Sequence, residues 1–162
     1  MDVDGTLTDG KIHIGESGEL FKSFSVKDGC GIKDILPQYD IIPVIITARQ
    51  SIILEHRCKE LNICHVYQGI RNKQEKMDEI IKNLSDSEIS NYTYSNVAYI
   101  GDDILDLQCM KVIKQNGGLI GCPVDAVNSV KKISDYISTK PGGEGAVREF
   151  IEYIVEYQCT EG

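Results

Sequence analysis

A run of apolar residues, IIPVIIT at positions 41–47, constrains the fold most strongly. A strand that is apolar at nearly every position is buried on both faces, which is typical of a parallel sheet covered by helices. Shorter apolar segments of the same kind lie at residues 64–67, 97–100 and 119–121. Apolar residues at helical spacing mark segments 29–36, 50–61, 73–84, 103–112 and 145–157. The alternation predicts an α/β fold built on a doubly wound, mostly parallel sheet.

Residues 11–25, KIHIGESGELFKSFS, break this alternation. Two strand-like stretches flank Gly-Glu-Ser-Gly, and these turn residues predict a β-hairpin. Because the hairpin directly follows the acidic start of the chain, we expect it to form a flap over that start. Pro37 is expected to end the helix at 29–36, and the polar segment 85–95 predicts a loop or an extra helical turn.

Length and composition suit one globular domain over residues 1–162, since 41% of the residues are hydrophobic and 26% are charged. No apolar run approaches the roughly 20 residues that a membrane helix needs, and no signal-peptide pattern opens the chain. The net charge of −8 argues against nucleic acid or an anionic membrane as a partner. An anionic small molecule stays possible where a metal or basic side chains reverse the local charge.

Six cysteines could form disulfides, but none lies in a CxxC pair. Four of the six lie among apolar residues in segments predicted to be core elements. Free thiols in a reducing cytoplasm are therefore the preferred interpretation.

The first acidic cluster is MDVDGTLTDG, in which Asp2 and Asp4 point to the same side of an extended backbone. A calcium-binding EF-hand loop also begins D-x-D, but Leu7 and His13 occupy the positions where that loop needs Gly and Glu. Only Met1 precedes the cluster, so either the first strand is shortened or the chain starts inside a longer product.

The second acidic cluster, Asp102, Asp103 and Asp106 of YIGDDILDL, follows the predicted strand 97–100. The carboxyl ends of strands in an open α/β sheet meet at one crevice, which would bring Asp102 close to Asp2 and Asp4. Like charges at this separation repel by several kcal/mol even at an effective dielectric of about 20. A hard divalent cation relieves the repulsion, and a small set of oxygen ligands favours Mg²⁺.

Two further strand ends carry groups that bind phosphate. Thr47 ends the strand at 41–47 and is followed by Arg49, while Lys73 opens the helix after the strand at 64–67. A hydroxyl beside a helix N-terminus binds phosphate oxygens, and a lysine neutralises their charge. Four successive strand ends thus carry side chains that can bind a metal ion or a phosphate group.

These residues resemble a known superfamily. DVDGTLT, the strand ending IIT, the Lys73 position and GDDILD resemble, in order, motifs I to IV of the haloacid dehalogenase superfamily. More narrowly, the chain is similar to the phosphatases of 3-deoxy-D-manno-octulosonate 8-phosphate (KDO 8-phosphate), in seven segments: DVDGTLTDG, the hairpin, SVKDGCGIK, ITARQ, YQGIRNK, YIGDD and GGEGAVRE. The resemblance extends from Asp2 to about Tyr157 and implies a Rossmann-like fold with a hairpin flap and no cap domain.

The resemblance implies a cytoplasmic Mg²⁺-dependent phosphatase of lipopolysaccharide biosynthesis that hydrolyses KDO 8-phosphate through an aspartyl phosphate. Asp2 would be the nucleophile and Asp4 the acid and base. Mg²⁺ would be held by Asp2, Asp102 and the backbone carbonyl of Asp4. Thr47 and Lys73 would bind the phosphoryl group, with Asp106 orienting Lys73.

The resemblance also implies which residues contact the sugar acid: Asp4, Ser25, Val26, Lys27, Asp28, Gly29, Lys33, Arg49, Arg57 and Lys73. Ser25 and Lys33 stand where the family commonly has Asn and Arg, which leaves the identity of the sugar open. Similar phosphatases form tetramers in which a Gly-rich tail reaches an active site. We therefore expect a homotetramer and a mobile tail at residues 140–149.

Three alternatives stay open. A phosphatase of a nonulosonate (sialic acid type) 9-phosphate would use the same chemistry, although Arg49 favours the KDO enzyme. The chain could instead be a non-catalytic oligomerisation module, like the domain attached to some CMP-sialate synthetases. Such modules can lose their catalytic carboxylates, and this chain keeps them, which favours an enzyme. A response-regulator receiver needs an Asp where the middle strand ends, and Thr47 stands there.

Overall fold

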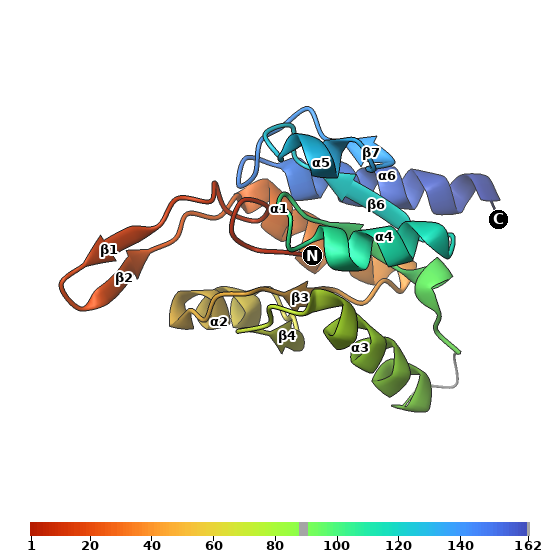
Figure 1. Ribbon diagram of the computed structural model, residues 1–162, viewed down its shortest axis with the longest axis horizontal. Coiled ribbons are helices and arrows are strands. Elements are labelled where there is room, and N and C mark those ends of the chain that lie inside the picture. Colours follow the sequence, from red (N-terminus) through yellow and green to blue (C-terminus); the bar gives the residue numbers. More distant parts are fainter. Residues whose placement is uncertain (88–90, 162) are drawn as a thin grey trace.

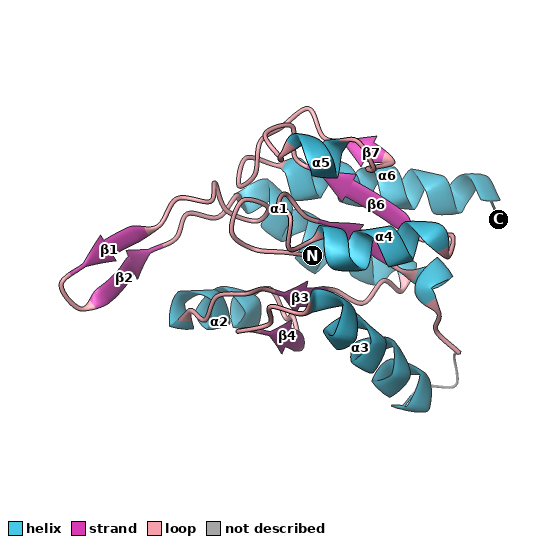
Figure 2. Cartoon of the chain, in the orientation of Figure 1, coloured by secondary structure: helices cyan, strands magenta, loops and turns pink. Residues whose placement is uncertain are grey.

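The computed structural model describes residues 1–87 and 91–161, and its helices alternate with short strands (Figures 1 and 2). The strands are β1 (His13–Gly15), β2 (Gly18–Phe21), β3 (Val44–Ile46), β4 (His65–Tyr67), β5 (Ala98–Ile100), β6 (Leu119–Cys122) and β7 (Tyr136–Ile137). The α-helices are α1 (Val26–Cys30), α2 (Ile52–Glu60), α3 (Lys73–Ser87), α4 (Leu107–Gln115), α5 (Asn128–Lys131) and α6 (Ala146–Glu161). A π-helix (Gly31–Ile35) and two 3-10 helices (Leu36–Tyr39 and Tyr94–Asn96) complete the elements.

Two parallel sheets, β3–β4 and β5–β6–β7, are joined through the first two residues of the chain. The Met1 amine donates to Val44 O and the Ile46 N–H donates to Met1 O, while the Asp2 N–H donates to Ile100 O. Met1 and Asp2 thus lie between β3 and β5 like a short strand, as the position of the N-terminus in Figure 1 shows. Asp2 is therefore fixed at the carboxyl edge of the sheet.

Helices cover both faces of this joined sheet, which confirms the doubly wound α/β prediction. Side chains from the π-helix Gly31–Ile35, α2 and α6 pack on one face in a core cluster with Ile45 and Ile100. Side chains from α3, α4 and α5 pack on the other face with Ile46, Tyr99 and Ile120. Neighbouring residues along a strand enter opposite cores because strand side chains alternate between faces.

The expected hairpin is formed by β1 and β2, which pair antiparallel. It projects from the rest of the molecule (Figure 1). His13 and Phe21 stack across it with their ring centroids 4.0 Å apart. Its apolar side chains Ile14 and Leu20 are 71% and 57% exposed, so the hairpin offers an apolar surface to solvent.

Several element boundaries differ from the prediction. Pro37 does not end the helical segment, since it lies in the first turn of the 3-10 helix Leu36–Tyr39, where its missing N–H needs no partner. Residues 41–43 do not extend β3, because Asp40 turns the chain with a φ of 53° and Pro43 lacks an N–H. α4 begins at Leu107 rather than near residue 103, because the Asp106 carboxylate accepts from the N–H groups of Asp102 and Asp103 and holds a turn there.

Other predictions can be compared directly. All six cysteines are free, three of them buried: Cys58, Cys109 and Cys122. In the segment 85–95, α3 continues to Ser87 and a 3-10 turn begins at Tyr94, while residues 88–90 lie outside the described residues. No helix in the described part of the chain is long and apolar enough to span a membrane. That residues 1–162 form one domain stays a prediction.

Candidate active site

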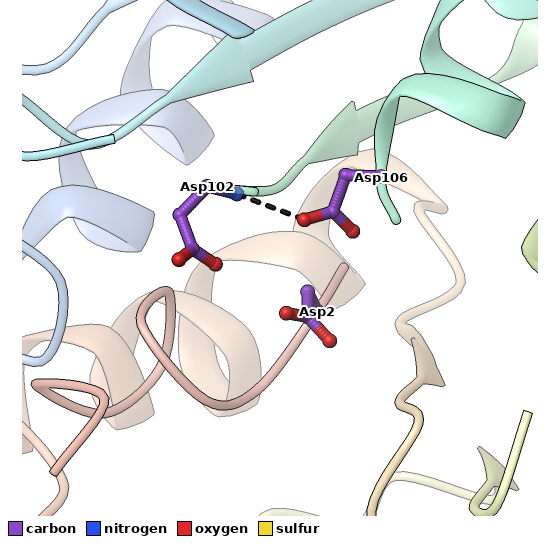
Figure 3. A group of neighbouring side chains, drawn as sticks. All are labelled: Asp2, Asp102 and Asp106. Atoms are coloured by element: carbon purple, nitrogen blue, oxygen red, sulfur yellow. Dashed lines mark hydrogen bonds between the residues drawn. The ribbon is translucent and has the colours of Figure 1, made fainter. Parts of the chain in front are cut away.

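Three aspartates meet at the carboxyl edge of the sheet (Figure 3). Asp2 comes from the strand-like start of the chain, Asp102 follows β5, and Asp106 precedes α4. One carboxylate oxygen of each lies within 4.8 Å of the others. The two acidic clusters of the sequence, a hundred residues apart, therefore meet at one site, although Asp106 rather than the predicted Asp4 completes the carboxylate group with Asp2 and Asp102.

Lys73, the first residue of α3, lies buried beside them with a residue exposure of 1%. Its Nζ is 2.7 Å from Asp2 Oδ1 and 2.7 Å from Asp106 Oδ1, and it donates to Tyr99 Oη at 3.3 Å. Burial lowers the pKa of Lys73, but the Asp2 and Asp106 carboxylates outweigh burial, so the pKa lies above its ordinary value. The lysine is held as a buried cation against the Asp2 carboxylate.

Asp106 serves to orient its neighbours. Its Oδ1 accepts from Lys73 Nζ and from Tyr99 Oη at 2.8 Å, and its Oδ2 accepts from the N–H groups of Asp102 and Asp103 at 3.0 and 3.1 Å. Gly101 allows this close approach, because a Cβ there would lie 2.3 Å from Asp106 Cγ. With both oxygens saturated by donors, Asp106 is poorly suited to bind a metal ion, although it lies in the acidic cluster.

The pKa values of Asp102 and Asp2 are both raised in the folded protein. Burial, followed by the nearby Asp2 and Asp106 carboxylates, raises the pKa of Asp102 to about 8. Burial and Asp106 likewise raise the pKa of Asp2 to about 6, although Lys73 opposes this. Asp102 Oδ1 accepts from Thr6 Oγ1 at 3.1 Å, while its Oδ2 has no hydrogen-bond donor among the described residues.

This donor set fits a divalent cation. Asp2 and Asp102 offer hard oxygen ligands, and a cation between them would replace the repulsion that raises both pKa values. Gly5 keeps the site open, since a Cβ at its φ of 95° would lie 2.1 Å from Asp102 Oδ2. The arrangement can therefore present a carboxylate nucleophile, a metal ion and a buried ammonium to one phosphoryl group.

Asp4 lies in a different environment at the foot of the hairpin. Lys22 Nζ donates to Asp4 Oδ1, and Arg49 Nε lies 3.7 Å from Asp4 Oδ2. Glu19 Oε1 lies 3.0 Å from Lys22 Nζ and 3.4 Å from Arg49 Nη2, and Glu19 Oε2 accepts from Ser51 Oγ. Arg49 is thus next to the site, as predicted, with its side chain 43% exposed.

The predicted sugar-binding segment 25–29 packs tightly against Arg57. Ser25 caps α1 by accepting from the Lys27 N–H at 3.2 Å, and Arg57 Nη2 donates to Ser25 O at 3.3 Å. Gly29 leaves room for this guanidinium, since a Cβ there would lie 2.3 Å from Arg57 Nη2. Arg57 also pairs with Glu60 at 2.8 Å, so it is engaged within the chain.

Asp28 is buried and connects this segment to α6. Its Oδ1 accepts from the Arg148 N–H at 2.8 Å, while its Oδ2 is buried without a partner in the structure. Burial, opposed by backbone N–H donors at the start of α6, raises the pKa of Asp28. Val26, Lys27 and Lys33 are exposed on the same helical segment.

The Gly-rich segment differs from the expected mobile tail. It packs against the chain's own acidic loop, with the Gly143 N–H donating to Thr6 O at 3.0 Å. A Cβ on Gly142 would lie 2.0 Å from Gly5 O. The segment thus supports the loop that carries Asp2 and Asp4, a contact between distant residues that the sequence pattern does not reveal.

Thr47 is buried where β3 ends, with its N–H donating to Tyr67 O at 3.0 Å. The sequence reasoning missed Tyr99, Lys22, Glu19 and Ser51. Tyr99 lies in a strand predicted as core, where only its hydroxyl signals a polar role. Phe24 packs on the core, and side chains two residues apart in an extended segment point to the same side. This spacing is the signal that could have indicated that Lys22 points inward.

A cavity of about 690 Å³ is lined by residues of β3, β5 and α6, among them Val44, Ala98 and Ile154, and it borders the site at Tyr99. None of the site aspartates lines it. Its lining is mostly apolar, so the polar groups described above are a better candidate for catalysis.

Comparisons with known proteins identify the family of this chain. The chain is 38% identical over 155 residues to the 3-deoxy-D-manno-octulosonate 8-phosphate phosphatase of Escherichia coli (strain K12), covering 96% of this chain and 77% of that protein. The chain belongs to the 3-deoxy-D-manno-octulosonate 8-phosphate phosphatase family of the haloacid dehalogenase superfamily. The Salmonella typhi member of the family is 37% identical over 155 residues, with the same coverage. No protein-family model matches the sequence.

Solved structures of the family have the same fold. The Moraxella catarrhalis phosphatase, in complex with a magnesium ion, a phosphate ion and a KDO molecule, superimposes with a TM-score of 0.85 at 39% identity, covering 96% of this chain and 83% of that one. The cobalt-bound Haemophilus influenzae enzyme gives a TM-score of 0.86 at 36% identity, covering 97% and 85%. These matches confirm the predicted superfamily fold.

Proposed function

We propose that this chain is a Mg²⁺-dependent phosphatase that hydrolyses KDO 8-phosphate to KDO and phosphate. The observation that carries the proposal is the buried group formed by Asp2, Lys73 and Asp102, in which Lys73 Nζ lies 2.7 Å from Asp2 Oδ1. The similarity to family members over 96% of the chain supports the substrate, since the Moraxella catarrhalis enzyme is described with KDO, phosphate and magnesium.

Asp2 is the nucleophile. A carboxylate oxygen of Asp2 forms a bond to phosphorus as the bond between phosphorus and the sugar oxygen breaks, which yields an aspartyl phosphate. Lys73, beside Asp2 Oδ1, stabilises the charge on the phosphoryl oxygens, and Asp106 and Tyr99 keep Lys73 in place. The Thr47 hydroxyl binds a phosphoryl oxygen at the end of β3.

Asp4 moves the protons. It donates a proton to the departing sugar oxygen, and then removes a proton from the water that attacks phosphorus and releases phosphate from Asp2. Its position two residues from Asp2 on an extended backbone supports this role. Its weaker burial, with 16% of the side chain exposed, also supports it, because water must reach it.

Magnesium is the cofactor, and Asp2, Asp102 and the backbone carbonyl of Asp4 would hold it. When bound, it would neutralise charge so that an anionic nucleophile can approach an anionic phosphate. The hydrogen bond that Thr6 donates to Asp102 Oδ1 orients the Asp102 carboxylate for this role.

The sugar acid lies between the hairpin and α1. Arg49 offers an exposed guanidinium next to Asp4, and Lys33 and Lys27 add positive charge on the neighbouring helical segment. Arg57 and Asp28 act on the substrate by holding segment 25–29, whose Ser25 and Val26 face the sugar, whereas Gly29 is buried against Arg57 and does not contact the sugar.

Phosphate release tests this function. The purified chain is assayed with Mg²⁺ on KDO 8-phosphate, a nonulosonate 9-phosphate, and glucose 6-phosphate as an unrelated phosphate. We expect the highest kcat/KM on KDO 8-phosphate and no turnover with EDTA. A higher kcat/KM on the nine-carbon substrate would reassign the sugar, and no turnover of any substrate would contradict an enzymatic role.

We also propose that the chain works in the cytoplasm as a homotetramer. The exposed apolar side chains of the hairpin, among them Ile14, Leu20 and Phe21, support contact with a second copy, and the free cysteines suit a reducing compartment. Light scattering at micromolar concentration should give four times the chain mass. Replacing Ile14 and Leu20 by Ser should lower that mass, whereas a fully active monomer would contradict the proposal.

A further inference from the structure

Lys22 is buried although it belongs to the part of the chain that projects most into solvent. Its side chain is 2% exposed, whereas Leu20 and Phe21 just before it are 57% and 50% exposed. Burying an ammonium group is costly unless it is paired. Lys22 is paired with two carboxylates, which compensate for its burial and hold its ammonium group in one position.

Both partners of Lys22 lie at the site. Its Nζ donates to Asp4 Oδ1 and lies 3.0 Å from Glu19 Oε1. The other Asp4 oxygen, Oδ2, has Arg49 Nε at 3.7 Å, beyond hydrogen-bond distance. Lys22 thus occupies one oxygen of Asp4 and leaves the second one available to a substrate oxygen or a water.

Glu19 connects this pair to the body of the protein. Its Oε2 accepts from Ser51 Oγ, and Ser51 also caps α2 by accepting from the Leu54 N–H at 3.3 Å. Hydrogen bonds from Ser51 and Lys22 hold the pKa of Glu19 below its ordinary value, against the effect of burial. Glu19 therefore holds the Lys22 ammonium and is itself anchored to the start of α2 through Ser51.

We propose that Lys22 is a positioning residue for Asp4: it fixes the carboxylate so that Oδ2 faces the oxygen that exchanges a proton, and it couples this orientation to the hairpin. The inference rests on the proposed function, in which Asp4 transfers protons in both steps. Among the described residues the polar contacts of Lys22 are with Asp4 and Glu19 and not with Asp2, Lys73 or Asp102, so its loss should impair proton transfer and leave phosphate binding intact.

The test compares K22M with K22R and with K11M, a control two residues before β1 whose side chain is 74% exposed and, among the described residues, pairs only with Asp9. We expect K22M to lower kcat by about 10- to 100-fold, the effect of a misplaced catalytic group, with KM and inhibition by inorganic phosphate unchanged. The fraction of enzyme trapped as acid-stable phosphoenzyme should rise, because its hydrolysis needs Asp4. K22R should recover part of kcat, and K11M should match the wild type.

Thermal melting separates this role from a structural one. If K22M does not fold, E19Q, which keeps Lys22 but weakens its anchor, should give a smaller loss of kcat in the same direction. A normal kcat in K22M or E19Q, a loss confined to KM, or an unchanged phosphoenzyme fraction would overturn the positioning role. An inactive wild-type chain would instead overturn the proposed function itself, and the wild-type assay detects that separately.

Discussion

Asp2 and Asp4 are two residues apart, yet the structure places their carboxylates in opposite environments. Asp2 lies in the core of the sheet edge, beside a lysine that is 1% exposed and two further carboxylates. Asp4 lies under a projecting hairpin, beside Lys22 and an arginine that is 43% exposed. The difference supports the proposed roles, in which Asp2 attacks phosphorus and the more exposed Asp4 exchanges protons with water and the sugar oxygen.

The largest effect should come from Asp2→Asn. An amide cannot form the aspartyl phosphate, so we expect kcat to fall by at least about a thousand-fold, as for other lost nucleophiles. An assay of phosphate release in quenched samples measures the loss of kcat, and circular dichroism checks that the fold is intact. Residual activity above a tenth of wild type would contradict the covalent route.

Asp102→Asn should be nearly as damaging through the metal. Since loss of an outer-shell partner alone weakens metal affinity by about 10- to 100-fold, loss of a direct ligand should cost at least about 100-fold in Mg²⁺ affinity. The neighbouring Asp103→Asn is the matched control, because within the described residues Asp103 Oδ1 accepts only from its neighbour Ile104 N–H. Mg²⁺ titration of activity distinguishes the two variants, and equal Mg²⁺ dependence would remove Asp102 from the metal site.

Asp106→Asn tests whether the activity of the buried centre depends on how Asp106 orients Lys73 and the backbone at Asp102. The amide keeps the size of the side chain but weakens the bonds to Lys73 Nζ and to two backbone N–H groups. We expect a kcat lower by about 10- to 100-fold. We also expect the free energy of unfolding to fall by about 3 kcal/mol, the lower end for a broken buried ion pair. Urea unfolding measures the stability, and unchanged values of both would contradict the orienting role.

The smallest effect is a pH dependence of stability confined to the metal-free protein. Folding raises the pKa of Asp2 to about 6 and that of Asp102 to about 8, from an ordinary value of 3.8. Between about pH 4 and 8 the folded protein then binds more protons than the unfolded chain, so stability falls as pH rises through this window.

Thermal melting at pH 5, 6.5 and 8 checks this dependence. In EDTA the melting temperature should decrease along the series, and Mg²⁺ should remove most of the decrease at pH 8. Asp102→Asn should flatten the EDTA curve. A melting temperature in EDTA that rises over this range would contradict the electrostatic description of the site.

Apart from Tyr99, the groups of the buried centre could be predicted from the sequence because they lie at the ends of expected strands or at the start of a helix. Asp2, Lys73 and Asp102 are local signals of this kind, and the topology of a parallel sheet brings them together. The hairpin foot could not be predicted, because the Lys22 contact with Asp4 depends on how a projecting hairpin folds back. The same holds for Gly142, whose Cα approaches the Gly5 carbonyl only through tertiary packing.

Trapping the phosphoenzyme tests the division of work between the two aspartates most directly. Wild type, Asp4→Asn and Asp2→Asn are mixed with KDO 8-phosphate and Mg²⁺, quenched in acid, and mapped by peptide mass spectrometry. We predict that phosphate accumulates on Asp2 in Asp4→Asn, is scarce in the wild type because hydrolysis is fast, and is absent in Asp2→Asn. Phosphate on another residue, or an Asp4→Asn variant that clears the intermediate as fast as the wild type, would contradict the account.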